Sequence, residues 1–247
     1  MRPIRFVVGT YNIWGTNRWP EREQALRAFL RDLRPDVLCL QEFRPETQAV
    51  LDDELSKHEH VRDPFEGWTR EGNIYWSTEL FELVQHGAEE IGIIETLRRL
   101  FWVRLRVTGT DSTVVIATAH YTWTGNKREV TEHVNPRIGQ AERTLQVLDR
   151  IVPADEPVIF MGDLNEAENA IKTLLRGGLM DCWRGKNTIP HATHPAYPTV
   201  MGPPRVIDWQ LYRGPIRPMV CEVVDYTKDA LTPSDHKPLL VAYGIEG

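Results

Sequence analysis

Carboxylate, amide and imidazole side chains stand at the ends of several apolar segments of this sequence. Asp163 and Asn165 follow Gly162 and an apolar run at residues 158–161, which has the length and composition of a buried strand. Residues two positions apart in an extended chain point the same way, so we expect the carboxylate and the amide to share one face. Aspartate and asparagine are also common turn and N-cap residues, and the pair alone fits a capped turn equally well.

The same arrangement recurs along the chain. Polar residues at or near the ends of other predicted strands are Asn12, Glu42 and His120. Asp208 lies inside an apolar strand pattern, where aspartate is depleted, so a buried Asp208 needs a partner. Asp235 and His236 come just before the last predicted strand. Each residue has a structural alternative: a turn asparagine, a solvated strand end or a hydrogen-bonded structural histidine.

Three of these side chains can supply oxygen ligands to a metal ion. Glu42 and Asp235 are carboxylates, and the Asn12 amide has a carbonyl oxygen. Hard oxygen donors suit Mg²⁺ or Mn²⁺ better than zinc.

The other five can handle protons and charge. His120 and His236 can donate a proton or act as an electrostatic clamp, and Asp208 can fix the tautomer of one imidazole. Asp163 can accept a proton from water, and Asn165 can donate a hydrogen bond to an oxyanion. With a metal ion, the set predicts attack of water on a phosphoester.

The hydrophobic periodicity predicts the elements that carry these residues. Helices are expected at residues 20–34, 45–56, 137–152 and 167–176. Strands are expected at residues 4–14, 36–42, 72–77, 98–107 (half-exposed), 113–120, 158–161, 206–212, 220–224 and 238–243. Residues 79–94 fit a strand pair or an irregular stretch, and residues 121–136 and 187–204 read as long loops. Strand ends that converge on one rim are a common way to build an active site.

Composition narrows the class of protein. At 247 residues with 41% hydrophobic and 26% charged residues, the chain fits one globular domain over residues 1–247. The net charge of -6 argues against a protein whose main function is to bind nucleic acid. A local basic patch is still compatible with this net charge. Three widely spaced cysteines suggest neither a disulfide framework nor a zinc site. No long apolar run or signal-peptide pattern occurs, so we expect a soluble, cytoplasmic protein with no membrane role.

Six short motifs, in order along the chain, resemble those of the endonuclease/exonuclease/phosphatase (DNase I-like) superfamily. They are Thr10-Tyr11-Asn12, Leu40-Gln41-Glu42, Thr118-Ala119-His120, Gly162-Asp163-Leu164-Asn165, Ile207-Asp208-Trp209 and Ser234-Asp235-His236. The superfamily includes DNase I-like nucleases, inositol polyphosphate 5-phosphatases, sphingomyelinases and deadenylases. The resemblance implies an α/β (α+β) fold: a four-layer α/β/β/α sandwich of two mostly antiparallel sheets flanked by helices.

The resemblance also implies roles. Glu42 would be the principal ligand of Mg²⁺ or Mn²⁺, aided by Asn12 and Asp235. Asp163 would orient or deprotonate the attacking water. Whether one or two metal ions take part, and which group is the general base, stays open.

The remaining roles concern the substrate. Asn165 and His120 would contact the phosphate, and His236, held by Asp208, would stabilise the transition state or act as the acid–base group. Arg137 opens an Arg-x-x-Gln element like that of the family and would contact the site, although an exposed arginine at a helix start is the structural alternative.

Two parts of the sequence depart from the family pattern or fit it only loosely: the position of Arg205, and the segment around Asn73, which matches the family's Gly-x-Ala-Ile-type strand only loosely. The family often has arginine two residues before the strand aspartate, whereas Arg205 precedes Asp208 by three, so Arg205 receives no role. Glu71 is a candidate carboxylate partner for His120.

The substrate is the least determined property. The acidic charge and the aromatic residues expected near the rim favour a small molecule or single-stranded nucleic acid over long duplex DNA. Those aromatic residues are Trp14, Trp19, Tyr121, Trp123 and Trp209. The alternatives are a DNA-repair type endonuclease or exonuclease and a non-catalytic scaffold on the same fold. No protein partner is evident.

Overall fold

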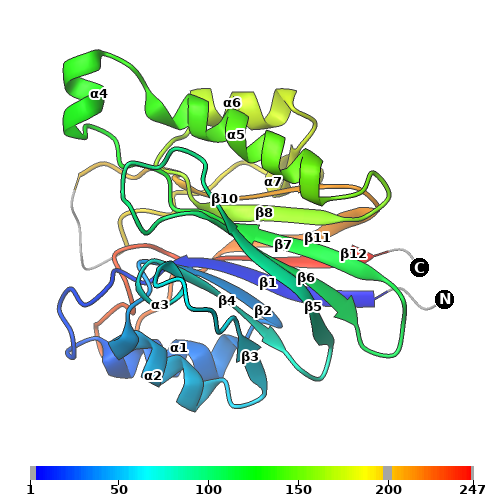
Figure 1. Ribbon diagram of the computed structural model, residues 1–247. Helices are drawn as coiled ribbons and strands as arrows, with labels where there is room; N and C mark the ends of the chain where they lie inside the picture. Colours follow the sequence, from blue (N-terminus) through cyan, green and yellow to red (C-terminus); the bar gives the residue numbers. More distant parts are fainter. Residues whose placement is uncertain (1–3, 197–201, 246–247) are drawn as a thin grey trace.

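The computed structural model describes residues 4–196 and 202–245, which form two six-stranded sheets packed face to face. Helices cover the outer face of each sheet, α1 and α2 on one side and α5 and α6 on the other (Figure 1). This is the four-layer sandwich that the family resemblance implies.

The first sheet is antiparallel apart from one parallel pair, β1 and β2. Its strands in spatial order are β11 (Ile216–Val223), β12 (Leu239–Ile245), β1 (Ile4–Asn12), β2 (Val37–Gln41), β4 (Gly72–Ser77) and β3 (His58–His60).

The second sheet repeats this pattern around its own parallel pair, β7 and β8. Its strands in spatial order are β5 (Phe81–Glu89), β6 (Leu100–Val107), β7 (Thr113–Thr118), β8 (Val158–Asp163), β10 (Asp208–Arg213) and β9 (Met180–Asp181).

A helix crosses over between the two strands of each parallel pair, α1 in the first sheet and α5 in the second. The helices are α1 (Glu23–Leu33), α2 (Pro45–Glu54), α3 (Gly67–Arg70), α4 (Lys127–Glu132), α5 (Pro136–Ile151), α6 (Asn169–Arg176) and α7 (Cys182–Gly185). Within the described residues, no helix is long and apolar enough to cross a membrane.

The strand directions bring the polar strand ends together. β1, β2, β7 and β8 all end at the left-hand edge of the sandwich in Figure 1, and the antiparallel β10 and β12 begin there. Asp208, the first residue of β10, lies opposite Asp163, the last residue of β8. Most of the predicted site residues therefore lie on one rim.

Apolar residues fill the interior. Residues such as Val8, Ile116 and Phe160 belong to the large buried cluster around the two sheets, whereas Leu26, Phe29 and others form a second cluster with α1 and α2. Burying an aliphatic or aromatic side chain of this size contributes about 1.5–3 kcal/mol.

Two glutamines cross the apolar interface with hydrogen bonds. Gln41 at the end of β2 donates from Nε2 to Thr118 Oγ1 of β7 at 2.8 Å. Gln210 of β10 donates from Nε2 to the carbonyls of Val8 and Leu239 at 3.0 and 2.8 Å. A wrong relative placement of the sheets would leave these buried groups unpaired, which costs about 1–3 kcal/mol per group.

Gly162 has a different role from the predicted turn. It lies inside β8 with φ +142°, and a Cβ there would come within 2.0 Å of the Ala119 carbonyl oxygen. Only glycine therefore lets the end of β8 approach the chain that follows β7.

The predicted element boundaries hold with several corrections. The segment at 121–136 is not a continuous loop, because Asn126 caps the short helix α4 by accepting a hydrogen bond from Glu129 N at 3.0 Å. β6 is mostly buried where a half-exposed strand was expected. Short elements with weak periodicity, such as β3 and β9, were not predicted. Within the predicted loop at 187–204, residues 197–201 lie outside the described residues.

The outer strands carry irregularities. The pairing register shifts between Leu83 and Gln85 in β5 and between Pro218 and Val220 in β11. The three cysteines are free, as expected, but the fold brings Cys182 into contact with Cys221.

Candidate active site

Asp163 is the centre of the polar rim. Its side chain is buried, and Oδ2 accepts a hydrogen bond from Asn12 Nδ2 at 3.0 Å. His120 Nε2 lies 3.3 Å from the same oxygen, and His236 Nε2 lies 3.7 Å from it. Strands of both sheets therefore direct donors at one carboxylate.

His236 is held by Asp208. Its Nδ1 lies 2.9 Å from Asp208 Oδ2, and both side chains are buried. The main chain on both sides is fixed as well, because His236 N donates to Ser234 Oγ at 3.1 Å and Ser234 Oγ donates to Asn12 O at 2.7 Å. The predicted pairing of Asp208 with an imidazole is confirmed.

The buried charges stabilise one another. Burial alone would lower the pKa of His236, but the Asp208 and Asp163 carboxylates outweigh it and raise this pKa to about 10. Burial alone would raise the pKa of Asp163, but His120, His236 and the Asn12 donor hold it below its usual range. Burial raises the pKa of Asp208, and His236 offsets only part of this effect. At neutral pH the rim therefore carries an ionised Asp163 beside a protonated His236.

Asn12 has a different contact from the one expected of a metal ligand. Its Oδ1 accepts from Trp14 N at 3.0 Å, and its Nδ2 donates to Asp163 and to Glu42 Oε1, the latter at 3.2 Å. A main-chain N–H can only donate and ionised carboxylates can only accept, so these neighbours fix the orientation of the amide. The Asn12 oxygen therefore faces Trp14 N and not the carboxylates in this structure, and an oxygen ligand at Asn12 stays a prediction.

Glu42 and Asp235 have the features of cation ligands. Glu42 follows β2 with φ +55°, is only partly buried, and its Oε2 has no hydrogen-bond donor among the described residues. The Asp235 side chain is 18% exposed. Neither carboxylate is fully buried, and carboxylate oxygens are the kind of ligand that a hard divalent cation prefers.

Arg22 holds two loops together beside these carboxylates through hydrogen bonds to main-chain carbonyls. The sequence analysis did not predict this role. Its buried guanidinium donates to the carbonyls of Trp14, Gly15 and Asn17 after β1, and to that of Pro233 in the loop that carries Asp235. The guanidinium also lies 5.5 and 5.3 Å from the ring centroids of Trp14 and Trp19. A lone arginine before an amphipathic helix gave no signal of this role.

His120 and Glu71 are not partners. Glu71 forms ion pairs with Arg98 at 3.0 Å and with Arg44 at 3.5 Å, although it borders the same small cavity as His120. His120 Nδ1 is buried and has no hydrogen-bond partner among the described residues.

Asn165 lies beside the site, but not through extended geometry. β8 ends at Asp163, and Asn165 has φ +49° with its main-chain N–H bonded to Asp163 Oδ1 at 3.0 Å. Its side-chain Nδ2 donates to Tyr121 O at 3.0 Å. The two interpretations of Asp163 and Asn165, a turn and a polar site, are therefore both partly correct, because the two residues form a turn that lies on the rim.

Arg137 faces anions, but they belong to the protein. Its buried guanidinium pairs with Glu129 of α4 at 2.5 Å and with Glu166 at 3.3 Å, and it donates to Thr122 O at 3.1 Å. These partners engage the guanidinium, so the predicted contact with substrate and the exposed alternative are both at odds with its surroundings. Arg137 joins α4, α5 and the chain after β8.

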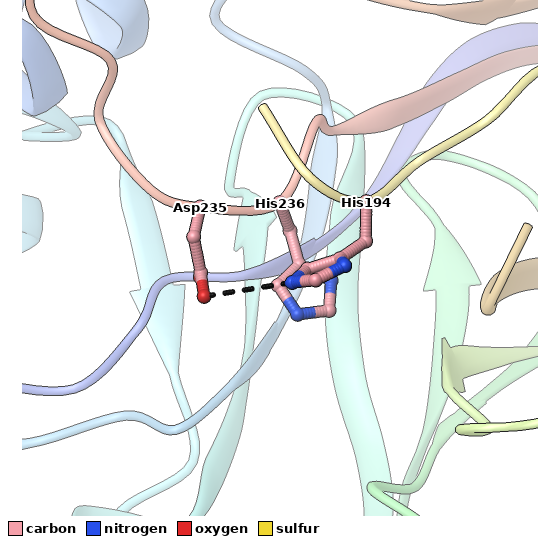
Figure 2. A group of neighbouring side chains, drawn as sticks. All are labelled: His194, Asp235 and His236. Atoms are coloured by element: carbon pink, nitrogen blue, oxygen red, sulfur yellow. Dashed lines mark ion pairs between the residues drawn. The ribbon is translucent and has the colours of Figure 1, made fainter. Parts of the chain in front are cut away.

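His194 lies at the rim although the sequence reading did not select it. Figure 2 shows its ring beside the His236 ring and facing the Asp235 carboxylate. The His194 and His236 ring centroids are 4.8 Å apart, and His194 Nε2 lies 3.7 Å from Asp235 Oδ2. The only signal was the richness of residues 187–204 in histidine, proline and threonine.

The rim aromatics differ in exposure. Tyr121 and Trp209 are buried, whereas Trp123 is 51% exposed. Trp123 borders a hollow of about 450 Å³ beside α4. The next residue, Thr124, donates to Asn165 O at 2.8 Å, which ties this loop to the rim.

The arrangement can carry out water-mediated attack on an electrophile. An ionised Asp163 can orient and accept from a water molecule, and a protonated His236 can stabilise negative charge that develops in the transition state.

Comparisons with known proteins agree with this geometry. The sequence model of the Endonuclease/Exonuclease/phosphatase family matches residues 9–236. Protein angel of Drosophila melanogaster is 28% identical over 161 residues, which make up 60% of this chain and 44% of that protein. The chain thus matches less than half the length of this relative.

Solved structures share the whole architecture. D. rerio TDP2 in complex with a single-stranded DNA product has a TM-score of 0.81 at 18% identity, over 97% of this chain and 98% of that one. The mannosyl-6-phosphatase Bt3783 of Bacteroides thetaiotaomicron has a TM-score of 0.78 at 17% identity, over 96% and 98%.

Proposed function

Because the chain belongs to the Endonuclease/Exonuclease/phosphatase family, we propose that it is a phosphoester hydrolase that acts with Mg²⁺ or Mn²⁺. The observation that carries the proposal is the buried Asp163, which Asn12 and His120 contact from the two sheets and which His236 faces at 3.7 Å. An ionised carboxylate beside a protonated imidazole, both buried, is not required to pack the ends of the strands, and such groups are typical of functional sites.

Glu42 and Asp235 would hold the metal ion. Their accessible carboxylate oxygens support this assignment, and Asn12 would keep Glu42 in place through its Nδ2–Oε1 hydrogen bond. When bound, the ion would neutralise charge on the phosphate and lower the barrier to attack by water.

Asp163 would orient the attacking water and accept its proton. The His120 contact and the Asn12 hydrogen bond keep the Asp163 carboxylate in one orientation. His236, charged and supported by Asp208, would stabilise the extra negative charge of the transition state or protonate the leaving group.

Asn165 would contact the phosphate, whereas the two ring nitrogens of His120 face Asp163 and the protein interior. One Asn165 amide hydrogen binds Tyr121 O, and the second remains for a phosphate oxygen. Arg137 has no part in this proposal, because Glu129 and Glu166 already neutralise it.

The substrate we favour is a small phosphoester or a single-stranded nucleic acid. Trp123 presents an exposed aromatic face in a hollow that Ile94 and Lys127 also border, and such a face can stack on a base or another planar group. The net charge of -6 disfavours a long polyanion as the main ligand. The single-stranded DNA product bound to D. rerio TDP2 keeps a DNA-repair nuclease as the second candidate.

The test is hydrolysis of bis(4-nitrophenyl) phosphate and 4-nitrophenyl phosphate with EDTA, Mg²⁺ or Mn²⁺. We expect metal-dependent hydrolysis that Asp163→Ala reduces by at least ~10²-fold, the scale of a positioned acid–base group. Diester activity would indicate a phosphodiesterase or nuclease, and monoester activity a phosphatase. Activity that survives both EDTA and the substitution would contradict the mechanism.

A competition experiment separates the substrate classes. Single-stranded oligonucleotide, duplex DNA and small phosphoesters are compared as inhibitors of the same assay. Tight, salt-sensitive inhibition by duplex DNA would overturn the preference for a compact or single-stranded substrate.

A further inference from the structure

The segment that carries His194 is fastened to the rim by its main chain. His194 N donates to Arg205 O at 3.1 Å, and Arg205 N returns a hydrogen bond to His194 O at 2.7 Å. Ala196 N donates to the main-chain oxygen of Asp235 at 2.6 Å, and Lys237 N donates to Thr193 O at 2.7 Å. The His194 ring therefore has a fixed position beside Asp235.

Arg205 determines which nitrogen of His194 carries the proton. Its Nη2 lies 3.3 Å from His194 Nδ1 in a hydrogen bond. A guanidinium can only donate, so Nδ1 must accept and the proton of the neutral ring is on Nε2. That Nε2–H lies on the side of Asp235, with 3.7 Å between Nε2 and Asp235 Oδ2 (Figure 2).

This tautomer argues against His194 as a metal ligand. An imidazole nitrogen that carries a proton has no lone pair for a metal ion. His194, Asp235 and His236 do lie close enough to suggest a shared ion. The orientation fixed by Arg205 instead makes His194 a donor directed at the carboxylate.

We propose that His194 is a positioning residue for Asp235, and that Arg205 sets the direction of its N–H. The inference rests on the proposed function, in which Asp235 helps to hold the divalent ion. Ser234 Oγ lies 3.3 Å from Asp235 Oδ1, so one oxygen has a hydroxyl neighbour and the other an imidazole N–H. The Ser234 proton is already donated to Asn12 O at 2.7 Å, so the His194 N–H is the donor that restricts rotation of the Asp235 carboxylate and prepares it to bind the ion.

The test is calorimetric titration of the metal-free protein with Mn²⁺. Removing an outer partner of a metal ligand typically costs 10–100-fold in affinity, so we expect His194→Ala to weaken Mn²⁺ binding about 10-fold. His194→Gln places an amide N–H near the position of Nε2, and we expect it to keep Mn²⁺ affinity within about 3-fold of the wild type, well inside that range. His191→Ala, an exposed histidine of the same segment, serves as the matched control.

Arg205→Met tests the second half of the proposal without removing the imidazole. The Arg205 side chain is exposed, and its main-chain bonds to His194 do not depend on it. We expect Mn²⁺ affinity to fall about 3-fold, less than the loss for an outer partner itself, because the ring can then adopt the other tautomer. This variant keeps the proposal testable if His194→Ala does not fold.

The outcomes separate the two proposals. Wild-type protein that binds no Mn²⁺ would overturn the proposed function together with this inference. Mn²⁺ binding that is unchanged in both His194→Ala and Arg205→Met would overturn the inference alone. A His194→Gln variant as weak as His194→Ala would contradict positioning through the N–H.

Discussion

The parallel pair β1–β2 and the parallel pair β7–β8 are built alike, each with a crossover helix on the outside, but their ends carry different chemistry. β1–β2 ends in Asn12 and a partly exposed Glu42, one of whose oxygens has no donor among the described residues. β7–β8 leads into His120 and Asp163, both buried and in contact with each other. The same local architecture thus supports an accessible anion on one side and an enclosed charge network on the other.

The difference suggests a division of labour. An accessible carboxylate can exchange water for a cation, whereas a buried one keeps its charge only through fixed partners. Asn12 joins the two ends because its amide donates to both Glu42 and Asp163. Under the proposed function, damage at one end should impair metal binding and damage at the other should impair chemistry.

The strongest test of this division is Asp163→Asn. We expect kcat/KM to fall about 10³-fold, within the range for a lost acid–base group, while Mn²⁺ affinity changes by less than about 3-fold. Steady-state kinetics and calorimetry measure the two effects on one preparation. Asp111→Asn, an exposed position, is the control, and a parallel loss of Mn²⁺ affinity in Asp163→Asn would erase the distinction between the two ends.

The support of the β7–β8 end can be broken at Arg137. Arg137→Met leaves Glu129 and Glu166 without their cation, and loss of one partner of a buried pair costs about 3 kcal/mol. We expect the free energy of unfolding to fall by about that amount in urea denaturation. Arg128→Met, which removes an exposed arginine, is the control and should change the free energy of unfolding by less than about 0.5 kcal/mol. Equal losses in Arg128→Met and Arg137→Met would contradict a structural role for Arg137.

The ion pairs of Arg137 with Glu129 and Glu166 make the stability of the fold depend on pH. Arg137 lowers the pKa of Glu129, and Asn135 and Arg137 lower that of Glu166 against the effect of burial. A lowered folded-state pKa stabilises the fold above the usual glutamate pKa of about 4.3, and the stabilisation is lost as the pH falls through the folded value. The stability difference between wild type and Arg137→Met should therefore be largest near neutral pH and shrink in acid. Urea titrations at several pH values measure it, and a difference that grows in acid would contradict this sign.

The opposite end is tested by Glu42→Gln. We expect Mn²⁺ affinity to fall at least about 100-fold, the upper limit for an outer partner, because a proposed direct ligand is lost. Part of the activity should return at high metal concentration. Exposed Glu46→Gln is the matched control, and an activity loss that no concentration of metal reduces would remove Glu42 from the metal-binding role.

The smallest effect should come from Trp123→Ala, outside both strand pairs. Stacking on an aromatic side chain contributes about 1–3 kcal/mol, so we expect KM to rise about 10-fold for esters with a planar leaving group. Esters without such a group should be unaffected. A uniform change for both kinds of ester would indicate a structural role for Trp123.

Much of this fold was predictable because the strands have a clear pattern in the sequence. Residues 113–120 and 158–161 are apolar runs that lie between turn residues, and each is followed by or ends in a polar side chain. The structure has β7 and β8 at these two segments. The convergence of Asp163, His120 and His236 followed from their common place at strand ends.

The surroundings that the sequence did not predict involve partners that lie far away along the chain. The orientation of the Asn12 amide depends on a nearby N–H and on Asp163, 151 positions away. Arg137 meets glutamates on two other segments, and Arg22 contacts a loop 211 positions later. Sequence patterns report the type of a side chain, but its surroundings decide whether it is free to act.

The register shifts in the outer strands bear on solubility and self-association. A regular outer strand presents a row of unpaired N–H and C=O groups to which a strand of another chain can add. Here β3 and β9 are three and two residues long, β5 carries a bulge, and β11 carries a bulge at Pro218. Bulges and proline interrupt such a row, so each sheet offers a poor template on both sides for growth into a fibre or a continuous intermolecular sheet.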